Sequence, residues 1–271
     1  MISRFGGETM PARPVVKLRR SVYVYDTFDI PWSTTGRPNL HQKTVRADVE
    51  KGHYLGLIGF DPMTRTGLHQ HQGTAISYFL DGSLYDFAGY AHMGQAGINL
   101  KGATHDAVAY NRCVLASRLE GPVHYPSTES VSDAVHTGAR HATIVNEAPE
   151  VMPDINITVD ALPSLTTHLA GVTRRLIFDY RRTDTDRRMV QLQLLPGTVL
   201  PVHRTTAALE WFLLGGDATV NGSAATAGSF VIVEPDTEVQ ISTDYGARLL
   251  AWSDGPIQWN DTARRSDLYG F

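Results

Sequence analysis

The sequence predicts an all-β protein that contains two antiparallel barrels. Short apolar runs alternate with turn residues along most of the chain, and convincing helical periodicity is absent. Glycines punctuate these runs at Gly82, Gly89, Gly94 and Gly102, which is typical of a small antiparallel barrel. The second half of the chain repeats the plan of the first, which indicates a duplicated fold. We therefore expect β-strands arranged as one barrel in each half.

The expected strands follow the apolar runs in chain order. An N-terminal arm holds a strand at 21–25, a turn at 31–38 and a strand at 43–49, and the first barrel continues with strands at 52–60, 75–80, 94–100 and 113–119. Prolines and small polar residues then dominate 122–163, which we expect to join the barrels and to pair in part with one of them. The predicted domains are an N-terminal barrel with its arm, a connecting segment and a C-terminal barrel, at 1–125, 126–163 and 164–271.

Composition narrows the class of partner. The chain has 271 residues, of which 42% are hydrophobic and 19% charged, and its formal net charge is −4. Without a long basic run, nucleic acid and anionic membranes are not expected partners, so a small-molecule substrate is favoured, with a homodimer as an open alternative. The single cysteine, Cys113, excludes an internal disulfide. The start lacks an apolar signal core and no apolar stretch could span a membrane, so we expect a cytoplasmic protein.

Three histidines form the candidate metal centre. His69 and His71 stand in Thr-Gly-Leu-His-Gln-His-Gln-Gly, and His105 closes Leu-Lys-Gly-Ala-Thr-His after a turn at Gly102. Alternate side chains of a strand share a face, so the first two imidazoles project the same way. Such a pair alone is about as often packed histidine as ligand. A strand that returns with His105 would complete a face of three nitrogens and leave coordination positions open.

With these residues the chain resembles the cupin superfamily, whose motifs are G-x5-H-x-H-x3-E-x6-G and P-x-G-x-x-H. His69, His71 and Gly82 match the first motif, and Gly102 and His105 match the second. The likeness covers roughly residues 28 to 122. It is greatest to ChrR-type anti-sigma cupin domains and to dioxygenase-like cupins that cleave acetylacetone or dihydroxyacetophenone. The resemblance implies that both barrels are cupin barrels, double-stranded β-helices of the jelly-roll type.

The chain departs from the family pattern at two positions. Ala75 stands where the motif has glutamate, and Leu100 stands where it has proline. The usual carboxylate ligand is therefore missing by alignment. A site of three histidines is similar to the diketone-cleaving members, whereas a zinc-holding ChrR-type site would be expected to keep the glutamate. Asp86 could turn toward the metal instead, although a salt bridge or turn cap is the commoner use of such an aspartate.

Strand parity predicts which side chains line the cavity above the histidines. Arg65 and Gly67 should share the inward face with the H-x-H pair, as should Ser77 and Phe79 on the next strand. We expect Ser77 and Phe79 to contact a substrate, with plain core packing as the alternative. Arg118 could hold an anionic substrate, but we expect it to reach solvent. The pair His124-Tyr125 and His92 have no partner at ligand spacing, and such histidines are expected at the surface.

The second barrel repeats the approaches to both motifs but not their ligands. Thr205 stands where the second histidine should be, and the terminal histidine falls near Val239 or Gln240. His203 and Glu210 alone would supply too few donors to replace the hydration shell of a divalent ion. We therefore expect a structural barrel that holds no metal, with a separate ligand pocket as the alternative.

Three functions are compatible with these features. The favoured one is a non-haem dioxygenase-like enzyme that acts on a small diketone or hydroxyketone, with Fe²⁺ as the expected metal and Zn²⁺ as the alternative. Three neutral imidazoles would leave the full charge on the ion, which favours an anionic enolate. The second function is a non-catalytic zinc sensor resembling the ChrR cupin domain, although no helical partner-binding domain or Cys/His zinc motif precedes the barrel. A metal-dependent isomerase or hydrolase would need a general base that the sequence does not reveal.

Overall fold

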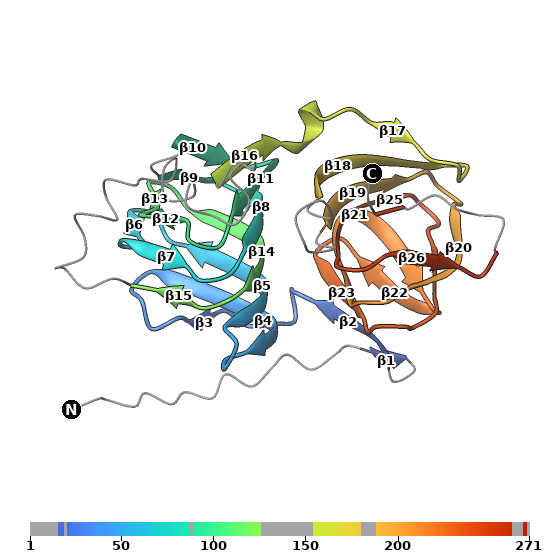
Figure 1. Cartoon of the computed structure of the whole chain (residues 1–271), viewed down its shortest axis with the longest axis horizontal. Coiled ribbons are helices and arrows are strands. Elements are labelled where there is room, and N and C mark those ends of the chain that lie inside the picture. Colours follow the sequence, from blue (N-terminus) through green and yellow to red (C-terminus); the bar gives the residue numbers. More distant parts are fainter. Residues whose placement is uncertain are drawn as a thin grey trace.

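The computed structural model describes residues 16–18, 21–86, 89–125, 154–179, 188–261 and 268–269. These ranges consist almost entirely of β-strands, with a short 3-10 turn, η3 (Val159–Ala161). Figure 1 shows two barrels side by side, the first in blue to green and the second mainly in yellow to red. The prediction of an all-β, two-barrel fold is confirmed. In the described ranges, no helix has the length and apolar character needed to cross a bilayer.

The first barrel combines three sheets. Its largest sheet, in spatial order, contains β16 (Asp154–Thr158), β11 (Gln95–Asn99), β8 (Ala75–Asp81), β14 (Cys113–Glu120), β5 (His53–Phe60), β4 (Leu40–Asp48) and β3 (Ser33–Thr34). A second sheet contains β10 (Gly89–His92), β9 (Ser83–Asp86), β13 (Val108–Ala109) and β6 (Thr64–Arg65). The third contains β12 (Thr104–His105), β7 (His69–His71) and β15 (Val123–His124). Four of the predicted strands form within one residue of their expected ends, as β5, β8, β11 and β14.

The second barrel is one large sheet with side branches. Its main path contains β1 (Val16–Leu18), β2 (Val22–Asp26), β23 (Ser229–Val233), β21 (Leu209–Val220), β25 (Ala247–Ser253), β19 (Arg188–Leu194), β18 (Val172–Asp179) and β17 (Leu165–Thr166). The branches are β20 (Val199–Thr205), β22 (Ser223–Thr226), β24 (Val239–Ser242) and β26 (Ile257–Trp259). Strands β19, β23 and β25 are buried on both faces, so alternate side chains pack either into the core of this barrel or into a second cluster that it shares with the first barrel.

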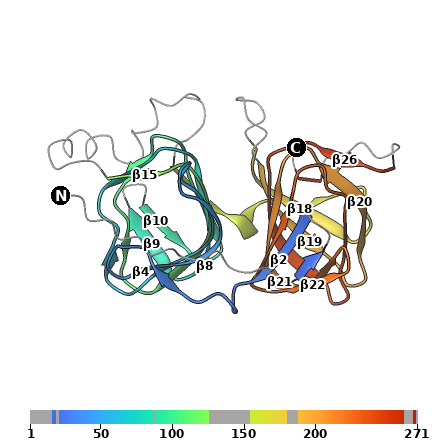
Figure 2. The ribbon, with the colours of Figure 1, turned by 90° about the horizontal axis from the view of Figure 1, so that it is seen from below.

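The two halves of the chain exchange strands. The strand expected at 21–25 forms as β2, but it pairs with β23 of the second barrel, in the register Val22↔Val233. Figure 2 shows this blue strand against the second barrel. In return, β16 lies within the predicted connecting segment, 126–163, and pairs with β11 of the first barrel, as expected for part of that segment. Hydrogen bonding therefore crosses the predicted domain limits in both directions. The rest of the predicted connection, 126–153, lies outside the described residues.

An apolar interface joins the two barrels. A single buried cluster contains residues of the first barrel, such as Ile76 and Ile98, together with Phe212 and Trp252 of the second. Burial of such large side chains is the main favourable term in joining two sheets. The interface therefore fixes the position of β8 and β11, which form one wall of the first barrel.

Arg118 contradicts the expectation that it reaches solvent. Its side chain is only 13% exposed and forms ion pairs with Glu120, Glu210 and Asp254. In β14 it alternates with residues that face the inside of the first barrel, so it lies on the outer face of that strand. The second barrel covers this face. Strand alternation places Arg118 on the outer face of β14, but whether that face meets water or protein depends on how the two barrels pack.

Candidate metal centre

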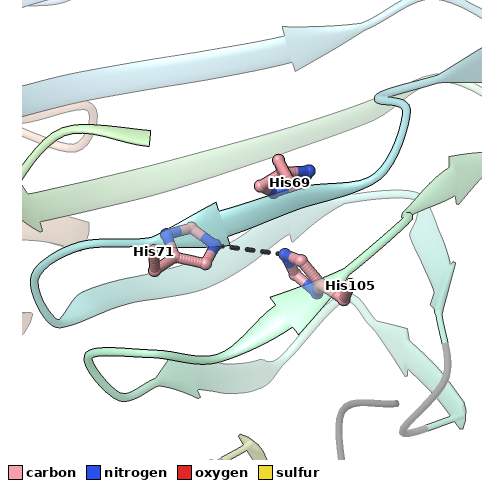
Figure 3. Close-up of side chains that lie close together, drawn as sticks. All are labelled: His69, His71 and His105. Carbon is pink, nitrogen blue, oxygen red and sulfur yellow. Dashed lines mark hydrogen bonds between the residues drawn. The ribbon is translucent and has the colours of Figure 1, made fainter. Parts of the chain in front are cut away.

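The structure brings the three predicted histidines together. β7 supplies His69 and His71, and the adjacent β12 supplies His105, which lies opposite His69 in the register. Their ligand nitrogens all lie within 4.8 Å of one another, and the two Nε2 atoms of His71 and His105 are 3.1 Å apart. Figure 3 shows the three rings converging from the two strands. Among the residues that the structure describes, this is the one such group of His, Cys and carboxylate side chains.

The distance between the nitrogens fits a shared ion. Two nitrogens that bind one ion at roughly 2.1 Å, with an angle near 90–110° between the bonds, lie about 3.0–3.4 Å apart. The 3.1 Å separation between the Nε2 atoms of His71 and His105 falls in that range. Imidazole nitrogens suit iron and zinc alike. The donor set is therefore suited to a divalent transition metal but does not select one.

Hydrogen bonds behind the rings fix two of the imidazoles. His69 donates its Nδ1–H to the carbonyl of Gly67 at 2.8 Å, and His105 donates its Nδ1–H to Oδ2 of Asp86 at 3.0 Å. In each ring this leaves the Nε2 lone pair on the side of the cluster. Partners of this kind orient metal-binding histidines and raise their basicity.

Asp86 thus lies behind a candidate ligand. Its Oδ2 accepts from the far side of the His105 ring, and its Oδ1 accepts the backbone N–H of Gly89 at 3.2 Å. In this arrangement the carboxylate does not replace the motif glutamate absent at Ala75. It caps the turn and orients His105.

Burial keeps His69 and His71 in the neutral form that a ligand requires. His69, His71 and His105 are 6%, 8% and 7% exposed. Desolvation, reinforced by the nearby His105, lowers the pKa of His69 to about 3 and that of His71 well below its ordinary value. At neutral pH these two imidazoles therefore present lone pairs without competition from a proton.

A cavity of about 150 Å³ opens beside the histidines. Its walls are mostly apolar, and they include both Ser77 and Phe79. The Ser77 hydroxyl is within hydrogen-bond distance of Ser117 Oγ, at 2.8 Å. Two polar side chains that the sequence did not single out, Asn99 and Asn156, also line the cavity. Asn156 comes from β16, so it reaches the site only through the exchanged strand.

The inward face before the H-x-H pair differs from the prediction. Arg65 points outward, with its side chain 72% exposed, and pairs with Asp106, whereas Thr66 lines the cavity. Gly67 adopts a positive φ of 75° between Thr66 and His69. This left-handed residue interrupts the strand, so the alternation that holds for the histidine pair does not extend back to Arg65.

Tyr125 is a partly exposed residue that the sequence did not assign to the site. Its ring centroid is 5.5 Å from that of His69, it lines the cavity, and the guanidinium of Arg37 lies 3.2 Å from the ring centroid. β15 pairs with β7 in the register Val123↔His71, which carries Tyr125 alongside His69. No local signal reveals this register, because the two strands are far apart in the sequence.

The second barrel does not bring His203 and Glu210 to one site. Nε2 of His203 accepts from the hydroxyl of Tyr269 at 2.8 Å. The Glu210 carboxylate forms ion pairs with Arg46 and Arg118 between the barrels. The two side chains therefore serve separate parts of the structure.

Comparisons with known proteins show which domain and which folds this chain is similar to. Residues 20–144 match the sequence profile of the ChrR cupin-like domain. A candidate dioxygenase from Nostoc punctiforme superposes with a TM-score of 0.70 at 11% identity, over 94% of this chain and 88% of that one. A variant of oxalate decarboxylase from Bacillus subtilis gives a TM-score of 0.59 at 11% identity, over 88% of this chain and 79% of that one. No curated protein matches the sequence.

At such low identities the structural likeness establishes the fold and leaves the activity open. The fold likeness extends over both barrels, while the sequence match and the three histidines belong to the first. Together these observations show that residues 20–144 are similar to the ChrR cupin-like domain and that the chain as a whole has a two-barrel, cupin-like fold.

Proposed function

We propose that this protein is a metal-dependent cupin enzyme that uses dioxygen to cleave a small diketone or hydroxyketone. His69, His71 and His105 would hold one Fe²⁺. The observation that carries the proposal is the convergence of three buried histidines beside a small, mainly apolar cavity. The fold shared with a candidate dioxygenase of Nostoc punctiforme supports it.

The residues suit an anionic chelating substrate. A bound divalent ion would supply Lewis-acid polarisation of the substrate oxygens. Because imidazole binds a metal as a neutral ligand, three such ligands would offset none of the ion's charge, which favours an enolate over a neutral ketone. The apolar wall at Phe79 would contact the alkyl part of the substrate and exclude water, while Ser77 would offer a hydroxyl. The cavity volume of about 150 Å³ restricts the substrate to a small molecule.

Oxygen uptake tests the proposal. Protein purified without oxygen and loaded with Fe²⁺ is expected to consume one O₂ for each diketone, because both oxygen atoms enter the products as one C–C bond breaks. A panel containing pentane-2,4-dione and dihydroxyacetophenone would be followed with an oxygen electrode, with the metal content of each sample measured. The His105→Ala variant should give no uptake. A flat trace for every ketone at full Fe²⁺ occupancy would contradict the dioxygenase proposal.

A zinc-binding sensor is the second candidate, favoured by the match of residues 20–144 to the ChrR cupin-like domain. The same three histidines would hold Zn²⁺ in a structural role. Stoichiometric zinc in protein purified from cells, together with no oxygen uptake after iron loading, would favour this function over the enzyme.

Asp86→Asn is expected to weaken divalent metal binding by about 10–100-fold, because it removes the charge-assisted hydrogen bond that orients His105. Competition with a chromophoric chelator would measure the affinity for Zn²⁺ or Co²⁺. Asp61→Asn is the matched control, since Asp61 accepts from Nε2 of His41 at 2.8 Å outside the candidate centre. Equal affinities of the two variants would show that Asp86 does not support the metal site.

A further inference from the structure

The second barrel retains one histidine in the geometry of the metal centre. His203 lies opposite Val239 on one neighbouring strand and opposite Trp259 on the other. In the first barrel, His69 likewise lies opposite His105 on β12 and has Tyr125 on its other side. In both histidines Nδ1–H donates to the carbonyl two residues earlier, at 2.9 Å for His203 and 2.8 Å for His69. Nε2 of His203 therefore points to the same place in the second barrel as Nε2 of His69 does in the first.

A phenol occupies the place in front of that nitrogen. The hydroxyl of Tyr269 lies 2.8 Å from Nε2 of His203, and both residues are 0% exposed. Because Nδ1 of His203 carries the proton donated to Pro201, Nε2 is the acceptor and the phenol is the donor. Burial lowers the pKa of His203 to about 4, so this acceptor is neutral at pH 7. The interaction is thus a neutral hydrogen bond in a closed, apolar environment.

The surroundings of Tyr269 are apolar and aromatic. Tyr269 belongs to the apolar core of the second barrel together with Leu268, and Trp259 packs against the same core. The ring centroid of His203 is 5.1 Å from that of Trp259 and 5.8 Å from that of Tyr269. An aromatic wall and one oriented acceptor are the features that select a small phenol, because an apolar molecule of the same shape would leave the acceptor without a donor.

We propose that the second barrel is a binding pocket for a small neutral phenol, which Tyr269 fills as an intramolecular ligand. The phenol hydroxyl donates to His203 where the first barrel has its metal centre. In the intact chain Tyr269 is held at a high effective concentration, so an external phenol competes poorly. Removal of the Tyr269 side chain opens the pocket to a phenol from solution.

The test uses the full chain with Tyr269→Ala and two probes that differ by one hydroxyl, p-cresol and toluene. The variant is expected to lose roughly 10 °C in Tm, since a buried aromatic side chain is removed. At a concentration about 100 times its Kd, p-cresol should restore about 5–10 °C, and toluene at the same concentration should restore much less. The wild-type protein should respond to neither probe.

Two further variants keep the test decisive. Tyr269→Phe retains the ring, so it should lose less Tm than the alanine variant and should not respond to p-cresol. If the Tyr269→Ala protein does not fold without a probe, Tyr269→Leu is used in its place. The leucine side chain fills part of the pocket, and this variant is tested with the same two probes. Equal protection by p-cresol and toluene would reduce the pocket to an apolar void and overturn the proposal. Protection by neither probe would overturn it as well.

Discussion

His105→Ala is expected to lower the affinity of the protein for a divalent metal by roughly 100-fold or more, a larger loss than a supporting residue gives. His105 supplies one of only three candidate ligand nitrogens, all within 4.8 Å of one another. The two histidines that remain could not replace enough of the hydration shell of an ion. Both barrels should stay folded, because their apolar cores do not depend on this side chain. Metal per chain by elemental analysis and the circular dichroism spectrum would check both parts.

The matched control for this variant is His92→Ala. His92 lies on β10 of the same barrel, and its Nδ1 contacts the carbonyl of Met93 at 2.9 Å, outside the group of three histidines. Its replacement should leave the metal content unchanged. A His105→Ala protein that retained one tightly bound ion per chain would remove the basis of the proposed metal centre.

Arg118→Met should lower the free energy of unfolding by about 3–5 kcal/mol, the usual cost of removing one partner from a buried ion pair. Arg118 donates to Asp254 at 2.9 Å and lies between Glu120 and Glu210, whose side chains are 9% and 2% exposed. Methionine can fill much of the space but cannot compensate buried carboxylates. Because Asp254 and Glu210 belong to the second barrel, the loss should also weaken the contact between the barrels. Urea unfolding followed by tryptophan fluorescence would measure it.

Lys51→Met provides the comparison for Arg118→Met. Lys51 pairs with Asp48 at 3.3 Å, but the two side chains are 69% and 42% exposed. Such a surface pair contributes less than about 1 kcal/mol, because water screens both charges. Equal losses of unfolding free energy in the two variants would show that the buried ion pairs of Arg118 stabilise the protein no more than a surface pair does.

The sequence by itself determined the strands and the three histidines of the candidate centre. Four strands of the first barrel were predicted within one residue, because period-two alternation and glycine turns are local signals. The H-x-H parity of His69 and His71 is local in the same sense. The repeat plan also placed Thr205, and either Val239 or Gln240, at positions where the second barrel lacks histidine, and the register of β20 with β24 puts Val239 opposite His203.

Only the tertiary structure decided which groups surround these histidines. Asp86 lies behind His105, Tyr125 lies beside His69, and Asn156 reaches the cavity from an exchanged strand. Each of these contacts depends on the register between strands that are distant in the chain, and no local pattern specifies it. Parity failed at Arg65 for a different reason, since the left-handed Gly67 interrupts the strand and turns Thr66 rather than Arg65 toward the cavity. Arg118 and Tyr269 were decided by packing, because the second barrel covers the first side chain and the core of that barrel encloses the second.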